Sequence, residues 1–297
     1  MEYIPAKTIV TKVKAPANWF GIDYNMNIYK GCSHGCIYCD SRSKCYHMEH
    51  DFEDIEVKEN AIDLLACALK RKRKKCMIGT GAMTDPYIPL EMEIRNVRKA
   101  LQLIYQYGFG FTVITKSRLI LRDLDLLQKI NEKTKCVVQM TLTTYDEELC
   151  RILEPNVCTT GRRAQVLEIL RDEGIPTVVW LSPILPFLND TKENIEGILE
   201  YCVRARVRGI ICFGMGMTLR QGDREYYYAA LDRHFPGLRE RYRRRYGQAY
   251  EVPSDRNGEL MELFYRICGE NGILCHVEEC FAYLHEFPER YEQLTLF

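Results

Sequence analysis

Hydrophobic positions alternate between two spacings along most of the chain, up to about residue 214. Short apolar runs of the kind that form buried strands are separated by segments of roughly 10 to 15 residues with the apolar spacing of helices. The predicted strands are Asn25 to Tyr29, Cys76 to Gly79, Phe111 to Thr115, Cys136 to Leu142, Thr177 to Pro183 and Gly209 to Phe213. The predicted helices include Glu59 to Lys70, Ile94 to Tyr107, Leu121 to Ile130, one ending near Gly174, and Asn194 to Ala205.

This alternation predicts an α/β fold with a parallel sheet, because parallel neighbours need a crossover connection between them. Six units are fewer than a closed eight-stranded barrel needs, so a partial (β/α)6 barrel or an open doubly wound sheet remains. After Gly214 the pattern is mostly helical, at Asp223 to Arg233, Leu238 to Tyr246 and Gly258 to Glu270. We therefore expect a barrel over residues 1–215, a helical C-terminal cap over 216–287 and an exposed tail over 288–297.

The composition is that of a globular protein, and the sequence also indicates where in the cell the protein acts. Of the 297 residues, 46% are hydrophobic and 28% charged, which excludes the disordered and fibrous classes. Lys and Arg (41) balance Asp and Glu (41), so any site for a polyanion must be local. No apolar stretch approaches the roughly 20 residues of a membrane span, and the first residues lack a secretory signal. We expect a cytoplasmic protein with no membrane partner.

Cysteines carry the chemistry of this sequence. The chain has 14 of them, and without an export signal metal or cluster ligation is a better explanation than disulfides. Cys32, Cys36 and Cys39 follow the first predicted strand in the sequence GCSHGCIYCD. This CxxxCxxC spacing, with the aromatic Tyr38 before the last cysteine, is typical of a [4Fe-4S] cluster ligated at three irons, which leaves one iron open to an external ligand.

A structural zinc ion is the alternative for this loop, since tetrahedral zinc needs a fourth ligand. The side chains that could supply it are His34, Cys45, His47 and His50. Three further cysteines, Cys268, Cys275 and Cys280, have irregular spacing and apolar neighbours. We interpret them as buried thiols.

The cysteine loop resembles that of the radical S-adenosylmethionine (SAM) superfamily, and other segments resemble its spore photoproduct lyase-like branch, the DNA repair photolyases. These segments are NIYKGCSHGCIYC, TDPYIPLE at Thr84 to Glu91, ITKSRLILRDLDLL at Ile114 to Leu127, LEP at Leu153 to Pro155 and GIPTVVWLSPILPFLND at Gly174 to Asp190. Together they cover about residues 15 to 215. Nothing comparable lies in the C-terminal third.

The resemblance implies a partial (β/α)6 TIM-like radical SAM barrel with the cluster and SAM at one rim, where functional groups of such barrels gather. Cys32, Cys36 and Cys39 would bind the cluster, and Tyr38 would shield it from water. Thr84 and Asp85 would contact the methionine amino and carboxylate region of SAM, and Lys116 and Thr141 its carboxylate and ribose. The plainer interpretation of Thr84 and Asp85 is a turn, and of Lys116 a solvated strand end.

The implied activity is that of a radical SAM lyase or DNA repair enzyme. An electron from a reductant such as flavodoxin or ferredoxin would cleave SAM at the cluster to a 5′-deoxyadenosyl radical, which abstracts hydrogen from DNA for lesion repair or base modification. Spore photoproduct lyase carries a hydrogen-donating cysteine where this chain has Ala82, so Tyr87 or the substrate would donate instead, or the product differs. Radical modification of RNA or a peptide, and a non-catalytic metal-bound adaptor, are the alternatives.

Two basic segments bear on a nucleic-acid partner. Lys70 to Lys75 lies at a predicted helix end, where cations favour the helix dipole, and we interpret it as solvated. Arg239 to Arg245 is interleaved with Tyr242 and flanked by Tyr246, an arrangement equally compatible with phosphate binding and with a solvated helix face.

The C-terminal sequence QLTLF resembles the peptide by which bacterial DNA polymerases and repair proteins bind the β sliding clamp. A glutamine amide anchors such peptides, and the apolar side chains enter pockets of the partner. The residues that would make these contacts are Gln293, Leu294, Leu296 and Phe297. The alternative is that this end folds back onto the cap.

Overall fold

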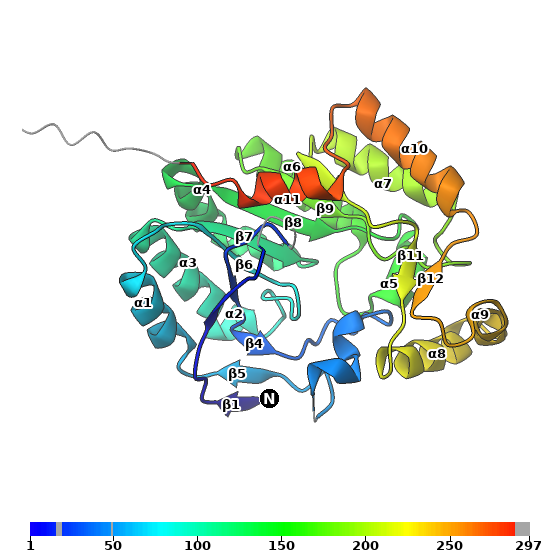
Figure 1. Ribbon diagram of the computed structural model, residues 1–297, viewed down its shortest axis with the longest axis horizontal. Coiled ribbons are helices and arrows are strands. Elements are labelled where there is room, and N and C mark those ends of the chain that lie inside the picture. The colour runs from blue at the N-terminus through cyan, green and yellow to red at the C-terminus, as the bar shows by residue number, and fades with distance from the viewer. Residues whose placement is uncertain (16–19, 49, 289–297) are drawn as a thin grey trace, which may run out of the picture.

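The computed structural model describes residues 1–15, 20–48 and 50–288 and centres on a curved seven-stranded sheet (Figure 1). The strand order is β10-β9-β8-β7-β6-β3-β2, and all neighbours are parallel except β2 (Val10–Lys12) and β3. The parallel strands are β3 (Tyr24–Met26), β6 (Met77–Thr80), β7 (Gly110–Thr115), β8 (Cys136–Thr141), β9 (Thr177–Trp180) and β10 (Gly209–Ile211). The predicted six parallel strands, in sequence order, are confirmed.

The first predicted strand is wrong in one respect, because Asn25 to Tyr29 forms two strands in two sheets. β3 joins the central sheet, whereas β4 (Tyr29–Lys30) pairs with β5 (Glu56–Lys58), which also pairs with β1 (Glu2–Ile4). The chain thereby leaves the central sheet immediately before the cysteine loop.

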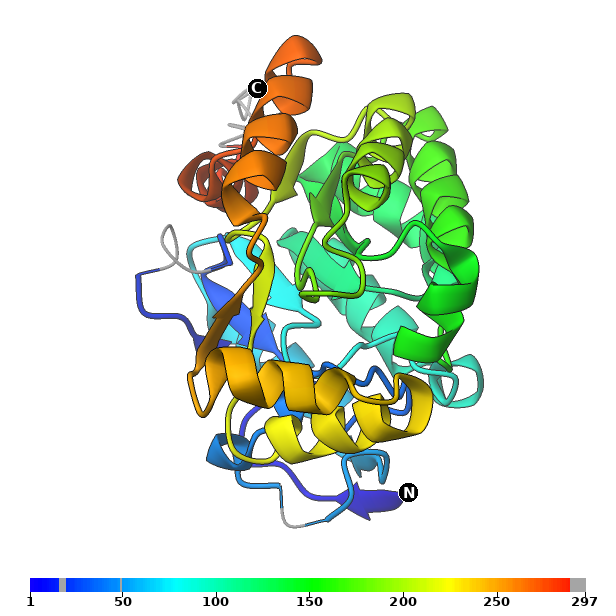
Figure 2. The same ribbon diagram turned by 90° about the vertical axis from the view of Figure 1, so that its right-hand side faces the viewer.

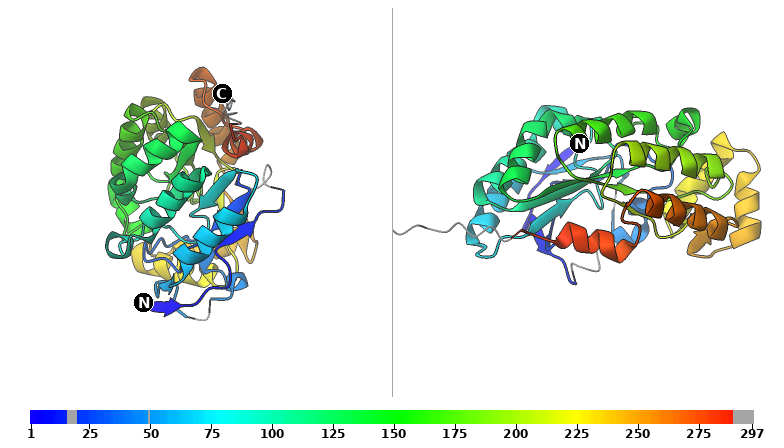
Figure 3. Two further views of the ribbon diagram at one scale, coloured as in Figure 1. Left: turned by 90° about the vertical axis from the view of Figure 1, so that its left-hand side faces the viewer. Right: turned by 90° about the horizontal axis from the view of Figure 1, so that it is seen from above.

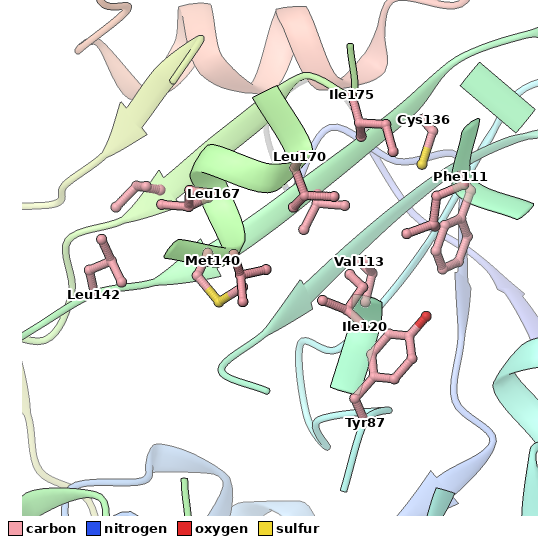
Figure 4. Packing of buried hydrophobic residues seen from close by; sticks show 14 of the residues in the cluster. Tyr87, Phe111, Val113, Ile120, Cys136, Met140, Leu142, Leu167, Leu170 and Ile175 are labelled. Atoms are coloured by element: carbon pink, nitrogen blue, oxygen red, sulfur yellow. The ribbon is translucent and has the colours of Figure 1, made fainter. Parts of the chain in front are cut away.

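Five crossover helices cover the outer face of the sheet (Figures 1 and 3). They are α1 (Ala61–Arg71), α3 (Asn96–Tyr107), α4 (Leu124–Lys133), α6 (Thr160–Asp172) and α7 (Lys192–Arg204). Alternate strand residues such as Val113 and Met140 pack against helix residues such as Leu167 (Figure 4). Because the strands follow sequence order with these helices on one face, the sheet is a partial (β/α)6 barrel rather than a doubly wound sheet.

The inner face of the barrel is filled near the start of its strands by a helix that the sequence pattern did not predict, α11 (Val277–His285). Cys280, Phe281 and Leu284 of this helix pack on Val137 and its neighbours in β9 and β10. Just before this helix, Leu274 forms an isolated β-bridge with Gly209. α11 therefore covers part of the inner face of the barrel, at β8, β9 and β10.

The rest of the C-terminal part packs in two places (Figure 2). Its elements are β11 (Gly216–Thr218), α8 (Asp223–His234), α9 (Leu238–Tyr246), β12 (Glu251–Pro253) and α10 (Asn257–Glu270). α8 and α9 lie together near the cysteine loop, and α10 lies beside the barrel helix α7. Leu260, Phe264 and Cys268 of α10 belong to the same hydrophobic core as the barrel helices. The predicted mostly helical C-terminal part is thus confirmed, and it shares its core with the barrel.

In the part of the chain that the structure describes, every helix is too short or too polar to cross a lipid bilayer. The clamp-like residues Gln293, Leu294, Leu296 and Phe297 lie outside the described residues, and their role stays a prediction.

Candidate active site at the carboxyl ends of the barrel strands

The cysteine loop is held to the barrel from two sides. The backbone N–H of Cys32 donates to the carbonyl of Phe52 at 2.8 Å, and that of Ile37 donates to the carbonyl of Leu153 at 3.0 Å. Asn156 closes the second side, because its backbone N–H donates to the backbone carbonyl of His34 at 3.1 Å. The loop between β4 and the 3-10 helix η2 (Asp40–Arg42) therefore has a fixed position against α5 (Glu147–Leu153).

The donor set of this loop fits an iron–sulfur cluster. Cys32 and Cys36 are buried and Cys39 is half-buried, and a thiolate charge on one of the three would act on the others. Burial, with the charge of Asp85, raises the pKa of Cys32 to about 12, so thiolates here need a compensating cationic group. Each cysteine of a cluster binds a different iron. Within the described ranges, no three His, Cys, Asp or Glu side chains surround a single-ion site.

Asp85 connects three segments of the rim. Its Oδ1 accepts hydrogen bonds from the N–H of Tyr87 at 2.9 Å and the hydroxyl of Thr115 at 2.8 Å, and its Oδ2 accepts from the N–H of Lys116 at 2.7 Å. His34 of the cysteine loop lies 3.4 Å from the same Oδ2 through its Nδ1. An ammonium group of SAM would therefore share this carboxylate with donors of the chain itself.

A buried ion pair links the cysteine loop to the end of β8. The Tyr38 hydroxyl donates to Glu154, and Glu154 pairs with Arg163, both fully buried. Arg163 also donates to the carbonyl of Thr141 at 2.7 Å. Burial alone would raise the pKa of Glu154, but the charges of Arg163 and Lys116 outweigh it and lower that pKa, which keeps the carboxylate ionised.

Lys116 is a buried cation beside the loop. It directly follows β7, and its Nζ lies 5.8 Å from the centre of the Tyr38 ring. Burial opposes its charge, but Cys36 and Glu154 together more than compensate and raise the pKa of Lys116. A protonated amine at this place suits a carboxylate ligand.

The structure brings most of the predicted site residues to one rim. Cys32, Cys36, Cys39, Tyr38, Asp85, Lys116 and Thr141 are joined by the contacts described above, and Thr84 is buried next to Asp85. Tyr87 is placed differently, with its ring on the helix side of β7 beside Val113 and Ile120 (Figure 4). Burial, with the charge of Asp123, raises the pKa of Tyr87 well above its ordinary value.

Sequence reasoning did not single out the Glu154–Arg163 pair or the contact of His34 with Asp85. The one available signal was the LEP segment, which contains Glu154. Arg163 gave none, since arginine in a helix is normally a surface residue.

The basic helix α9 pairs most of its charge within the C-terminal part. Arg239 lies 2.5 Å from Asp232, and Arg245 lies 2.6 Å from Asp255. The guanidinium of Arg241 lies 3.8 Å from the centre of the Phe187 ring. These contacts favour the interpretation of α9 as a solvated helix face.

Residues 26–202 match the family described as the Radical SAM superfamily. The chain belongs to this superfamily, whose members use a [4Fe-4S] cluster and SAM, and these are its cofactors. An uncharacterised protein of Mycobacterium tuberculosis is 29% identical over 262 residues, 84% of this chain and 76% of that protein. Another, from Methanocaldococcus jannaschii, is 31% identical over 191 residues, 64% of this chain and 69% of that protein.

Among solved structures, the fold matches that of spore photoproduct lyase. A cysteine-to-alanine mutant of that enzyme superposes with a TM-score of 0.67 at 16% identity, covering 92% of this chain and 80% of the lyase. The lyase complexed with dinucleoside spore photoproduct gives a TM-score of 0.64 at the same identity and coverage. The likeness shows a common fold that includes the C-terminal part beyond residue 202.

Proposed function

We propose that this radical SAM enzyme acts on nucleic acid, with DNA as the first candidate, in lesion repair or base modification. The observation that carries the proposal is the extent of the fold likeness to spore photoproduct lyase, which covers 92% of this chain. By contrast, the match to the superfamily ends at residue 202 and does not include the C-terminal part. The resemblance of the sequence segments to the same branch supports the same substrate class.

In this proposal Cys32, Cys36 and Cys39 bind the cluster, and SAM lies between them and the ends of β6, β7 and β8. The bound cofactors supply the chemistry of hydrogen-atom abstraction. Lys116 offers a charge to the carboxylate of SAM. Thr84, Asp85 and Thr141 complete the contacts, and the Glu154–Arg163 pair fixes the cysteine loop relative to β8.

The hydrogen donor differs from that of spore photoproduct lyase, because Ala82 stands where the lyase has a cysteine. The sequence offers Tyr87 or the substrate as the donor. Its ring is fully buried in the core on the helix side of β7. We infer that the substrate, rather than Tyr87, is the better candidate for the donor.

Isotope transfer tests the substrate class. The protein is reconstituted anaerobically with iron and sulfide, reduced, and incubated with SAM and deuterated nucleic acids or peptides. We expect deuterium in 5′-deoxyadenosine when ultraviolet-damaged or undamaged DNA is present. Deuterium transfer from RNA or a peptide alone would identify that molecule as the substrate class instead. A protein that binds only zinc and releases no 5′-deoxyadenosine would be a non-catalytic adaptor.

A further inference from the structure

An exposed phenylalanine stands at the mouth of the barrel. Phe213 lies two residues after β10 and is 59% exposed, the largest exposed fraction of any aromatic side chain in the described residues. Its ring centre is 6.0 Å from that of Trp180 and 6.4 Å from that of Phe281. Trp180 in turn stacks on Phe20 at 5.3 Å. Phe213 is thus the exposed end of a group of four rings, which we call the aromatic group.

The aromatic group begins next to the candidate SAM site. Trp180 is the last residue of β9 and is the register partner of Thr141 on β8, and neighbouring strands are about 4.8 Å apart. The Trp180 Nε1–H donates to Gln139 Oε1 at 2.7 Å, which fixes the indole on the inner face of the sheet. A substrate that reaches the site therefore passes close to these rings.

A cavity of about 800 Å³ adjoins Phe213 between α10 and α11. Phe213 and Phe281 line it, as do Tyr265 and His276, whose rings stack at 5.5 Å with 26° between their planes. This volume lies within the range of small-molecule sites. The wall formed by these rings suits a flat ring system.

The polar groups of the cavity indicate which part of a nucleic acid would enter it. Glu278 and Asn257 line it, whereas no Lys or Arg does among the described residues. A phosphate would meet a carboxylate without a compensating cation. A base instead offers both donors and acceptors at its edge, which the Glu278 carboxylate and the Asn257 amide can satisfy.

We propose that Phe213 and this cavity receive an unstacked base of a single-stranded or locally opened nucleic acid. The inference rests on the proposed function and names the form of its substrate. Bases stack on aromatic side chains with little sequence preference, and a base inside a duplex has no free face. Bound in this way, the strand is held beside the rim that carries the cysteine loop.

The test measures binding of oligonucleotides to the reconstituted protein. In a Trp19→Phe background Trp180 is the single tryptophan of the chain, so its emission reports on the aromatic group. We expect single-stranded oligothymidylate to change this emission. Phe213→Ala and Tyr265→Ala should weaken binding roughly tenfold, and Phe213→Tyr should retain it.

Tyr105→Ala is the matched control, since Tyr105 is an exposed aromatic residue on α3, on the outer face of the barrel. We expect its affinity to equal that of the parent, and thermal unfolding checks that each variant is folded. Unchanged affinity of folded Phe213→Ala and Tyr265→Ala would overturn this inference and leave the proposed function standing. Tighter binding of duplex than of single strands would also overturn it, whereas failure of the parent to bind any nucleic acid would overturn the proposed function as well.

Discussion

At the scale of single residues, the site depends on charges that are buried in pairs. Arg163 and Glu154 are both inaccessible to solvent, yet each is ionised because the other lies against it. The pair also holds Tyr38 of the cysteine loop and the carbonyl of Thr141. One ion pair thus sets the distance between the candidate cluster ligands and β8.

Glu154→Gln should strongly destabilise the fold. The substitution leaves the guanidinium of Arg163 buried without its counter-charge, for which a loss of about 3–5 kcal/mol in the free energy of unfolding is expected. Urea denaturation measures the effect. Glu270→Gln is the control, because Glu270 pairs with Arg266 on the surface at 3.4 Å and should lose less than about 1 kcal/mol. Equal losses in the two variants would refute the structural role of the buried pair.

The residues that sequence could predict are those tied to strand ends. The cysteine spacing located the loop. The family resemblance assigned Asp85, Lys116 and Thr141 to SAM, and their places after strands agree with the rule that such barrels carry their chemistry at the carboxyl ends of strands. Glu154 and Arg163 could not be predicted, because a buried ion pair depends on two segments meeting in space. The sequence therefore predicts the residues of the site better than the contacts that hold them in position.

At the scale of elements, regular alternation made the barrel predictable, whereas short or irregular elements were missed. From β6 to β9 each parallel strand lies between helices, and these strands were expected. α11 was missed, and its position inside the barrel depends on long-range packing on Val137 and Val178, which the local sequence pattern does not show.

Leu284→Ala tests whether α11 is an integral part of the barrel. Leu284 is fully buried in the cluster that α11 forms with the inner face, so its truncation should cost about 2–5 kcal/mol of unfolding free energy. Glu279→Ala, an exposed position of the same helix, should change it by less than about 0.5 kcal/mol. Denaturant titration compares them, and a small effect of Leu284→Ala would mean that α11 is only loosely attached.

The start of α8 should respond to pH through Asp223. This carboxyl is buried, with Oδ1 accepting from the N–H groups of Arg220 at 2.7 Å and Arg224 at 2.8 Å. Burial, with the charge of Asp40, raises the pKa of Asp223 to about 6. The native state then keeps a proton that the unfolded state releases, so the stability contributed by Asp223 falls as pH rises from about 4 to 6.

Asp223→Asn removes this titration and keeps one acceptor oxygen for the helix start. The unfolding free energy of the variant relative to the parent should therefore rise between about pH 4 and pH 6, by on the order of 2 to 3 kcal/mol, and stay level above about pH 7. Denaturant unfolding across this range measures the difference. A difference that does not change with pH would contradict the raised pKa.

At the scale of the whole molecule, the C-terminal part completes the barrel. Phe264 and Cys268 of α10 lie in the core of the barrel helices, and Phe281 lies on its inner face. We propose that residues 1–215 and 216–287 form one cooperative unit, although the sequence pattern separates them. The alternation of strands and helices ends near residue 214, whereas the packing that joins the two parts cannot be seen in the sequence pattern.

Radical SAM chemistry at the cysteine loop is tested by the release of 5′-deoxyadenosine from SAM by the reduced, reconstituted protein. We expect release by the parent and by Cys67→Ala, whose cysteine is exposed on α1, and none by Cys36→Ala. Release by Cys36→Ala at the rate of the parent, or none by a parent that carries the cluster, would contradict the account.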